Sequence, residues 1–294
     1  METNNVERKP LGWSYGGQAV MEGVLMRSAT RAAVAVRHPN GSIVVKTEPL
    51  GSLYTGPISR IPFLRGLPML WDALGLGMRA LFFSAEVAEQ GETPGYTLSG
   101  ATSVSMGLLS LALGLGLFML LPSLIAGWLI PHDQALVFNI VEGLIRLAIL
   151  IGYMVAVGRV PEIRRVFAYH GAEHKTINAH EAGAPLTVEA VQKYSTAHPR
   201  CGTAFLLVVV VISILVFAPL GKPTLALRLA SRLVLLPVIV GVAYEALRFT
   251  GRHADNPVIR ALIAPNLALQ RLTTREPDDS MVEVAIAALN AVLA

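Results

Sequence analysis

The chain has 294 residues, of which 53% are hydrophobic and 15% charged, with a net charge of +4 and a pI near 9.4. This apolar content exceeds what one soluble core of this length needs, which argues against a soluble protein. No nucleic-acid partner is expected, because the basic residues fall between apolar runs and form no stripe. The single cysteine, Cys201, excludes an intramolecular disulfide.

The first predicted unit is a cytoplasmic, β-rich N-terminal segment, residues 1–56. Two runs of small or β-branched residues, 32–37 and 42–46, flank Asn40-Gly41, which is a strong hairpin signal. Upstream, residues 16–27 combine several glycines with an isolated Glu22 and Arg27. A tight glycine turn there could bring backbone amides to a ligand, so Glu22 and Arg27 are site candidates without an assigned role.

Residues 57–92 are predicted to form an amphipathic helix that lies in the membrane interface. Pro68 suits the first turn of a helix that runs to about Glu89. Arg65 and Arg79 fall on one face, and several leucines supply apolar bulk. The alternative is a short transmembrane helix, which the cost of placing Arg79 in lipid disfavours.

Residues 93–251 are predicted to form a four-helix membrane domain, and the fold class is therefore mainly α and polytopic. The expected spans are 101–130, 135–157, 203–220 and 225–248, each near the length that a bilayer requires. Arg228 and Arg232, at the outer end of the fourth span, are expected to extend to the membrane surface and stay hydrated. The expected partner is the lipid bilayer, and assembly into a homo-oligomer is left open.

The distribution of basic residues predicts the orientation. Of the 24 Lys and Arg, 20 flank one side of the spans, whereas Lys222, Arg228 and Arg232 cluster at the other. Both termini, the 158–202 loop and the tail 252–294, which ends in a short helix, are therefore expected in the cytoplasm. The start of the chain has no apolar stretch, so a cleaved secretory signal is not expected.

Besides Arg228 and Arg232, further charged residues fall inside or at the edge of the spans. Glu142 and Arg146 are four residues apart, which predicts an ion pair along one helix face. The alternative is a polar pathway or a substrate anchor. Glu245, at the inner end of the fourth span, is either a ligand for the cytoplasmic site or the partner of Arg248.

The strongest local motif is Tyr-His-Gly-Ala-Glu-His-Lys, residues 169–175, in the 158–202 loop. His170 and His174 share a helix face and can chelate one metal ion. The order His-x-x-Glu-His is typical of inverzincins, in which the glutamate, here Glu173, is the general base. The alternative is a solvated helix with polar residues and no metal.

A second cluster lies at the end of the same loop, where His198 and Cys201 are three residues apart. Together with His170 and His174 they would complete a closed, structural zinc tetrahedron. If Cys201 is instead a buried apolar thiol, three histidines leave the open position that a catalytic metal needs. Glu181 is a further carboxylate candidate, expected to be a surface residue.

Four motifs in order resemble the YqhQ-like family, a bacterial family of membrane proteins with a domain of unknown function. They are Gly-Gly-Gln-Ala-Val-Met-Glu-Gly-Val-Leu-Met-Arg, Tyr-His-Gly-Ala-Glu-His-Lys-Thr, His-Pro-Arg-Cys-Gly-Thr and Arg-Leu-Thr-Thr-Arg-Glu-Pro-Asp-Asp. The resemblance implies a metal-dependent enzyme of the bacterial plasma (inner) membrane, with a site at His170, Glu173, His174, His198 and Cys201. We therefore expect a hydrolase activity and a divalent metal cofactor, with zinc as the first choice. The alternative is a scaffold, assembly or transport protein with a structural metal site.

Overall fold

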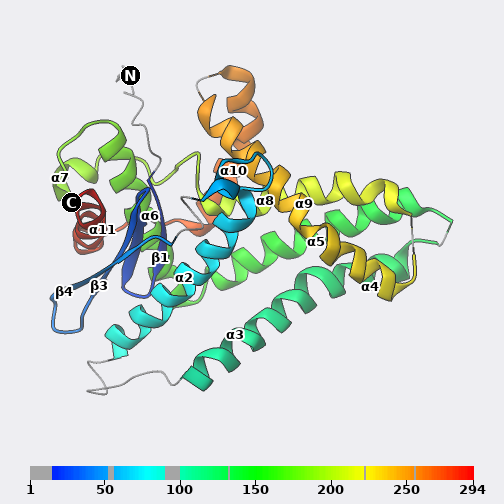
Figure 1. Ribbon diagram of the computed structural model, residues 1–294, viewed down its shortest axis with the longest axis horizontal. Coiled ribbons are helices and arrows are strands. Elements are labelled where there is room, and N and C mark those ends of the chain that lie inside the picture. The colour runs from blue at the N-terminus through cyan, green and yellow to red at the C-terminus, as the bar shows by residue number, and fades with distance from the viewer. Residues whose placement is uncertain (1–14, 52–55, 90–99, 132, 222, 255) are drawn as a thin grey trace.

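The computed structural model describes residues 15–51, 56–89, 100–131, 133–221, 223–254 and 256–294. A small antiparallel sheet with flanking helices forms one end of the molecule, and a bundle of long apolar helices extends away from it (Figure 1). The protein is mainly α-helical, as the sequence predicts. The part of the expected N-terminal segment before Tyr15 lies outside the described residues.

The sheet has the order β1-β2-β3-β4, with every neighbouring pair antiparallel. The strands are β1 Gly16–Val20, β2 Gly23–Arg27, β3 Arg31–Arg37 and β4 Ile43–Pro49. The predicted hairpin at Asn40-Gly41 joins β3 and β4, and Gly41 has the positive φ of 89° that favours glycine there. The glycines of residues 16–27 lie within β1 and β2, so they do not form an isolated ligand-binding turn.

Helices cover both faces of the sheet. Side chains of one face, such as Val24 and Met26, pack against α6 (Pro161–Glu181) and α11 (Asp279–Leu293). The alternate residue Leu25 faces α2 (Gly66–Glu89) instead. Because side chains alternate between the two faces of a strand, the central strands β2 and β3 are apolar and buried almost throughout. The sheet is therefore the middle layer of a three-layer unit.

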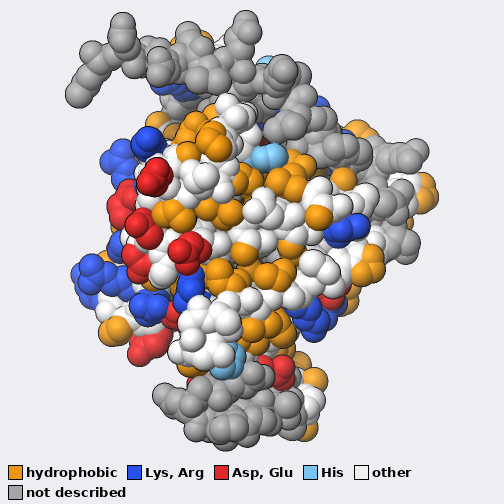
Figure 2. Space-filling model, turned by 90° about the vertical axis from the view of Figure 1, so that its left-hand side faces the viewer, with side chains coloured by type: hydrophobic (Ala, Val, Ile, Leu, Met, Phe, Trp, Pro, Cys, Tyr) orange, Lys and Arg blue, Asp and Glu red, His pale blue; other side chains and the backbone are white. Residues whose placement is uncertain are grey.

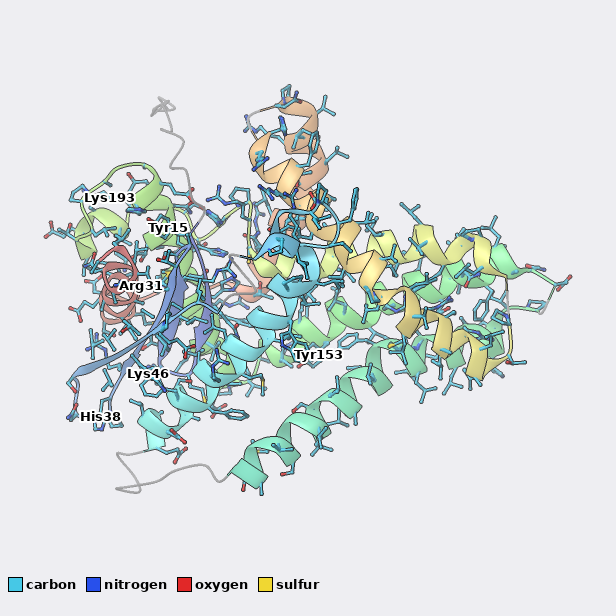
Figure 3. The ribbon with its side chains drawn as sticks, in the orientation of Figure 1. Tyr15, Arg31, His38, Lys46, Tyr153 and Lys193 are labelled. Carbon is cyan, nitrogen blue, oxygen red and sulfur yellow. The ribbon has the colours of Figure 1, made fainter. Side chains whose placement is uncertain are left out.

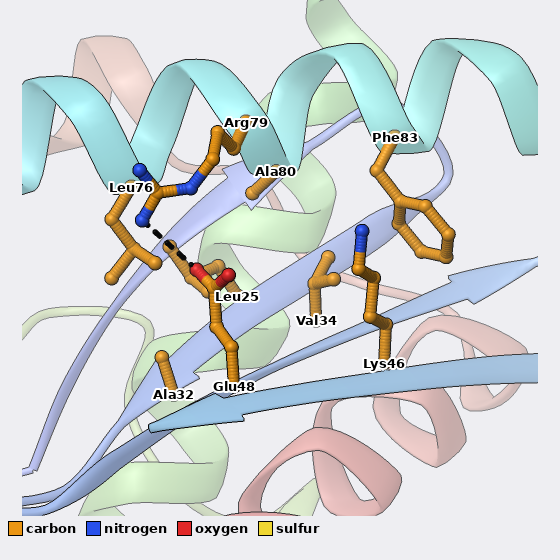
Figure 4. A pocket seen from close by; sticks show the side chains of 9 residues that line it. All are labelled: Leu25, Ala32, Val34, Lys46, Glu48, Leu76, Arg79, Ala80 and Phe83. Carbon is orange, nitrogen blue, oxygen red and sulfur yellow. Dashed lines mark hydrogen bonds and ion pairs between the residues drawn. The ribbon is translucent and has the colours of Figure 1, made fainter. Parts of the chain in front are cut away.

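Helix α2 follows the predicted boundaries, but one of its apolar faces packs on protein. Leu76, Ala80 and Val87 are buried against the sheet, while Trp71 is 74% exposed. Arg79 donates a hydrogen bond to Glu48 of β4 at 3.1 Å (Figure 4). The pocket beside this pair has a volume of about 20 Å³, room for about one water molecule, so it is too small for a substrate.

The described residues contain four helical segments long and apolar enough to cross a membrane, as predicted. The first runs over Gly100–Leu129 and combines α3 (Gly100–Leu115), a π-helical turn η2 (Gly116–Leu120) and α4 (Leu121–Leu129). The others are α5 (Ala135–Val157), α8 (Gly202–Phe217) extended by η3 (Ala218–Leu220), and α9 (Leu225–Arg252). Large apolar side chains such as Trp128 and Val234 are exposed on these helices, as lipid-facing residues are.

Regular structure outside the spans is more extensive than expected. The 158–202 loop consists mostly of α6, followed by the short α7 (Val188–Val191). The C-terminal tail holds a second, unpredicted helix, α10 (Pro257–Thr273), before α11. A short 3₁₀ turn, η1 (Pro57–Arg60), precedes α2. Seen from the sheet end, the surface carries Lys, Arg, Asp and Glu side chains in groups between apolar ones (Figure 2).

Candidate metal centre

Helix α6 carries the central motif and is held against two other parts of the chain. Its buried residues run from Ala168 to Ala179. Gly171 lies in contact with the backbone of Arg275, and a Cβ at this position would come closer than 3.0 Å to the Arg275 carbonyl oxygen. The glycine therefore allows the segment between α10 and α11 to pack directly on α6, next to His170.

Three potential ligands meet at this point. One donor atom from each of His170, His174 and Cys201 lies within 4.8 Å of those of the other two. The shortest separation is 3.1 Å, between His170 Nε2 and Cys201 Sγ. Cys201 is the residue before α8, and its sulfur also accepts a hydrogen bond from the backbone N–H of Thr203. The group thus joins α6 to the start of the third span.

The second ring nitrogen of each histidine is bound to the backbone. His170 Nδ1 lies 2.9 Å from the carbonyl oxygen of Thr273, and His174 Nδ1 lies 2.6 Å from that of Thr196. A carbonyl only accepts hydrogen bonds, so both rings carry their proton on Nδ1 when neutral. Each Nε2 atom then carries the lone pair that a metal ion would bind, which is the arrangement that supports histidine ligands in metal sites.

The Nε2 of His174 is buried and has no hydrogen-bond partner among the described residues. In a tetrahedral zinc site, nitrogen and sulfur donors lie roughly 3.6 Å apart, as follows from zinc–ligand bonds of about 2.0 and 2.3 Å. Separations up to 4.8 Å would have to close by about 1 Å, a movement that side-chain rotation can supply. The donor types, their burial and the orphaned nitrogen fit a soft divalent metal such as zinc.

His198 lies beside these residues but outside the group of three. Its ring centroid is 5.6 Å from that of His174, and its Nε2 is 3.7 Å from a carboxylate oxygen of Glu181. Burial lowers the pKa of His198 to about 4, so the ring is neutral at physiological pH. Its Nε2 has no hydrogen-bond partner within the described ranges. His198 Nδ1 accepts a hydrogen bond from the Arg200 N–H at 3.4 Å, so the neutral ring carries its proton on Nε2, and His198 stays outside the three grouped donors.

Glu181 and His180, at the end of α6, are engaged elsewhere. Glu181 is paired with Arg200, and it is only partly exposed. His180 packs edge-on against Tyr15, with ring centroids 5.0 Å apart. Tyr15 lies just before β1 (Figure 3). Neither residue belongs to the group of three.

Glu173 is 4% exposed and faces the sheet. Its carboxyl group packs against Gly17 of β1 and accepts a hydrogen bond from the Gly17 backbone N–H. Burial raises the pKa of Glu173 to about 7, although His170 and the Gly17 N–H both oppose that rise. One carboxylate oxygen has no partner in the described part of the chain. The N-terminal glycine motif thus contacts the metal-site helix through Glu173.

Glu22 and Arg27 have different surroundings. Glu22, in the turn between β1 and β2, has φ of 48° and accepts two hydrogen bonds of 2.6 Å from Arg165 of α6. The Tyr169 hydroxyl lies 3.2 Å from the same carboxylate. Glu22 therefore fixes α6 to the sheet. Arg27 ends β2, opposite Gly16, and does not belong to the group of three ligands.

The predicted Glu142–Arg146 ion pair is present at 2.7 Å, but a second arginine joins it. Arg232 of α9 lies 2.7 Å from the other oxygen of Glu142. The expectation that Arg228 and Arg232 extend to the membrane surface is wrong, because they are only 5% and 4% exposed. Both arginine side chains point into the bundle. Arg228 donates a hydrogen bond to Ser123 and lies over the ring of Phe138. Arg232 donates to Asn139 and lies over the ring of Phe217.

Glu245 lies at the contact between α9 and the segment before α2. It is bound by the guanidinium of Arg65 and by the backbone N–H of Phe63. The partner expected from the sequence, Arg248, is not the one that binds it. Glu245 is thus an anchor of the α2 unit on the bundle and is not among the grouped metal donors.

Several residues that build the site give no signal in a single sequence. Thr196 and Thr273 act through backbone carbonyls, which every residue type possesses. Gln270 of α10 is buried, and its side-chain amide accepts a hydrogen bond from the His198 N–H and donates one to the His198 carbonyl oxygen. Among these residues, Gly171 is the exception. A glycine inside a helical motif can indicate that another segment of backbone packs closely against the helix.

Comparison with known proteins places the chain in a family. Residues 61–294 match the family described as "Protein of unknown function (DUF1385)". The chain is 37% identical over 293 residues to "Uncharacterized protein YqhQ" of Bacillus subtilis (strain 168), and the match covers 95% of this chain and 92% of that protein. No solved structure matches. The chain therefore belongs to the YqhQ-like family of proteins of unknown function (DUF1385).

Proposed function

We propose that this membrane protein is a metal-dependent hydrolase whose site lies at the cytoplasmic face of the plasma membrane. The observation that carries the proposal is the grouping of His170, His174 and Cys201, with both histidine Nδ1 atoms bound to backbone carbonyls. The cytoplasmic orientation follows from the excess of Lys and Arg on the side of the spans that carries α6.

The residues of the site suit the steps of a hydrolysis. A divalent metal held by these three residues would supply Lewis-acid chemistry and a lowered pKa of water. Glu173, whose pKa is about 7, can accept a proton from an attacking water and later return it to a leaving group. His198, which is neutral and beside His174, would orient the substrate through its Nε2–H or, after a change of tautomer, complete the ligand set.

A second function is favoured by a specific observation, the position of Glu173 against Gly17. If the carboxylate only fastens β1 to α6, the metal would act as a structural link between α6 and the start of α8. The protein would then be a scaffold, assembly or transport protein with no hydrolytic step.

Metal analysis of variants tests the metal site that both functions share. The wild-type protein purified from the membrane is expected to hold about one metal ion per chain, and the His170→Ala/His174→Ala variant to lose it. Exposed His253 provides the matched control, since His253→Ala should retain the metal. Unchanged metal content in the double variant would refute the site.

Glu173→Gln tests the hydrolase itself. The amide keeps the size of the side chain and removes the base, so the variant should fold and bind metal. A screen of phosphoester, peptide and lipid ester substrates with wild type should give turnover that Glu173→Gln lowers by a factor of about 10² or more. Equal turnover by both proteins would refute Glu173 as the general base, and turnover by neither protein with metal retained would favour the structural link.

A further inference from the structure

Three guanidinium groups are buried around one carboxylate at the end of the bundle away from the sheet. Arg146, Arg228 and Arg232 are each at most 9% exposed, and Glu142 is 1% exposed. Arginine stays protonated in proteins, so all three carry a positive charge. With Glu142 as the one carboxylate paired to this group in the described part of the chain, the cluster has a net charge of +2.

Among the described residues, Arg228 is the arginine of this cluster that forms no ion pair with a carboxylate. It donates to the hydroxyl and carbonyl oxygens of Ser123 at 3.0 and 3.3 Å and to the carbonyl of Pro223 at 3.1 Å, and it lies over the ring of Phe138. Its Nε has no hydrogen-bond partner within the described residues. Neutral acceptors do not cancel a charge, and a buried charge without a counterion costs several kcal/mol.

Arg228 lines a cavity of about 390 Å³ between α4 and the start of α9. Ser123 and Thr224 add hydroxyl groups to the lining, and Gly127 contributes no side chain. A Cβ on Gly127 would lie 3.8 Å from Arg228 Nη1, an ordinary contact, so Gly127 borders the guanidinium on the side of the cavity. A phosphate group occupies about the volume of a few water molecules, at about 30 Å³ each. The volume of the cavity is therefore several times that of a phosphate group.

We propose that this cavity binds the phosphate group of a phospholipid. Arginine with hydroxyl neighbours is a common phosphate-binding combination, and the phosphodiester would supply one of the two negative charges that the cluster lacks. The rest of the lining is apolar: Leu124 and Leu225 border the cavity and are 48% and 39% exposed on helices that face lipid. The site therefore offers a charged interior for the phosphate and an apolar border for acyl chains.

Lipid binding by the full-length protein tests this proposal. Delipidated protein in detergent is titrated with dioleoylphosphatidylglycerol, with dioleoylglycerol, which has the same chains and no phosphate, or with inorganic phosphate. Thermal unfolding and native mass spectrometry report binding. We expect the phospholipid alone to raise the melting temperature and to remain bound to about one site per chain.

Variants locate the binding. Arg228→Gln should weaken phospholipid binding on the order of tenfold or more, as loss of a charge-assisted hydrogen bond requires. Gly127→Leu keeps the charge and fills the cavity, and it should have the same effect even if Arg228→Gln fails to fold. Arg252→Gln, at the exposed opposite end of α9, is the matched control and should bind like wild type. Equal binding by all four proteins, equal stabilisation by dioleoylglycerol, or full stabilisation by inorganic phosphate would each overturn the proposal.

Discussion

Gly171 offers the sharpest test of how α6 is positioned, because alanine normally stabilises a helix interior. At this position an added Cβ would come closer than 3.0 Å to the Arg275 carbonyl oxygen. Overpacking of this kind costs about 1–3 kcal/mol, and the helix preference for alanine returns roughly 0.5–1 kcal/mol. The Arg275 N–H also donates to the Phe167 carbonyl at 2.9 Å, a bond that displacement of this segment would break. Gly171→Ala is therefore expected to destabilise the protein by about 2 kcal/mol.

The same displacement should affect the metal site, since Thr273, two residues before Arg275, accepts the hydrogen bond from His170. Unfolding followed by circular dichroism in detergent measures the stability, and elemental analysis measures metal retention. Gly152→Ala on α5 is the control, because no atom lies within 4 Å of the added Cβ, and no loss of stability is expected. A Gly171→Ala protein as stable as wild type, with full metal content, would refute the close packing.

Three further predictions concern other parts of the chain. Glu142→Gln leaves two buried arginines without their carboxylate and should destabilise the bundle by about 3–5 kcal/mol in the same unfolding assay, and a loss below about 1 kcal/mol would contradict the network. Asp278 caps α11 by accepting a hydrogen bond from the Met281 N–H, so Asp278→Ala should cost about 1 kcal/mol, and unchanged stability would contradict the capping role. Reporter fusions at Gln134 and after Ala294 should report opposite sides of the membrane, with Ala294 inside, and equal activity of a cytoplasmic reporter at both would refute the topology.

The membrane helices and the hairpin were predictable because their signals are local. Uncharged apolar runs define the spans, and Asn40-Gly41 defines a turn whose chemistry depends on two residues. The pair His170 and His174 was likewise accessible, because a spacing of four residues places side chains on one helix face. Helix α10 was missed, since Pro265 and a mixed polar pattern conceal it within the expected tail.

Most contacts between distant segments were not predictable. Burial of Arg228 and Arg232 depends on Phe138, Glu142 and other residues of neighbouring helices, whereas the sequence shows only two arginines near a span end. The hydrogen bonds to His170 and His174 come from backbone carbonyls, and no residue type identifies these in advance. The sequence therefore indicated the side chains of the candidate site more readily than the backbone groups that hold those side chains in place.

The central claim is that His170, His174 and Cys201 hold one divalent metal ion, and X-ray absorption spectroscopy of the purified protein tests it most directly. For a zinc-loaded wild-type protein we expect a shell of nitrogen donors at about 2.0 Å and one sulfur at about 2.3 Å. Cys201→Ser should remove the sulfur shell while nitrogen donors remain. A spectrum with only oxygen donors, a sulfur shell unchanged in Cys201→Ser, or no metal held at a stoichiometric level would contradict the claim.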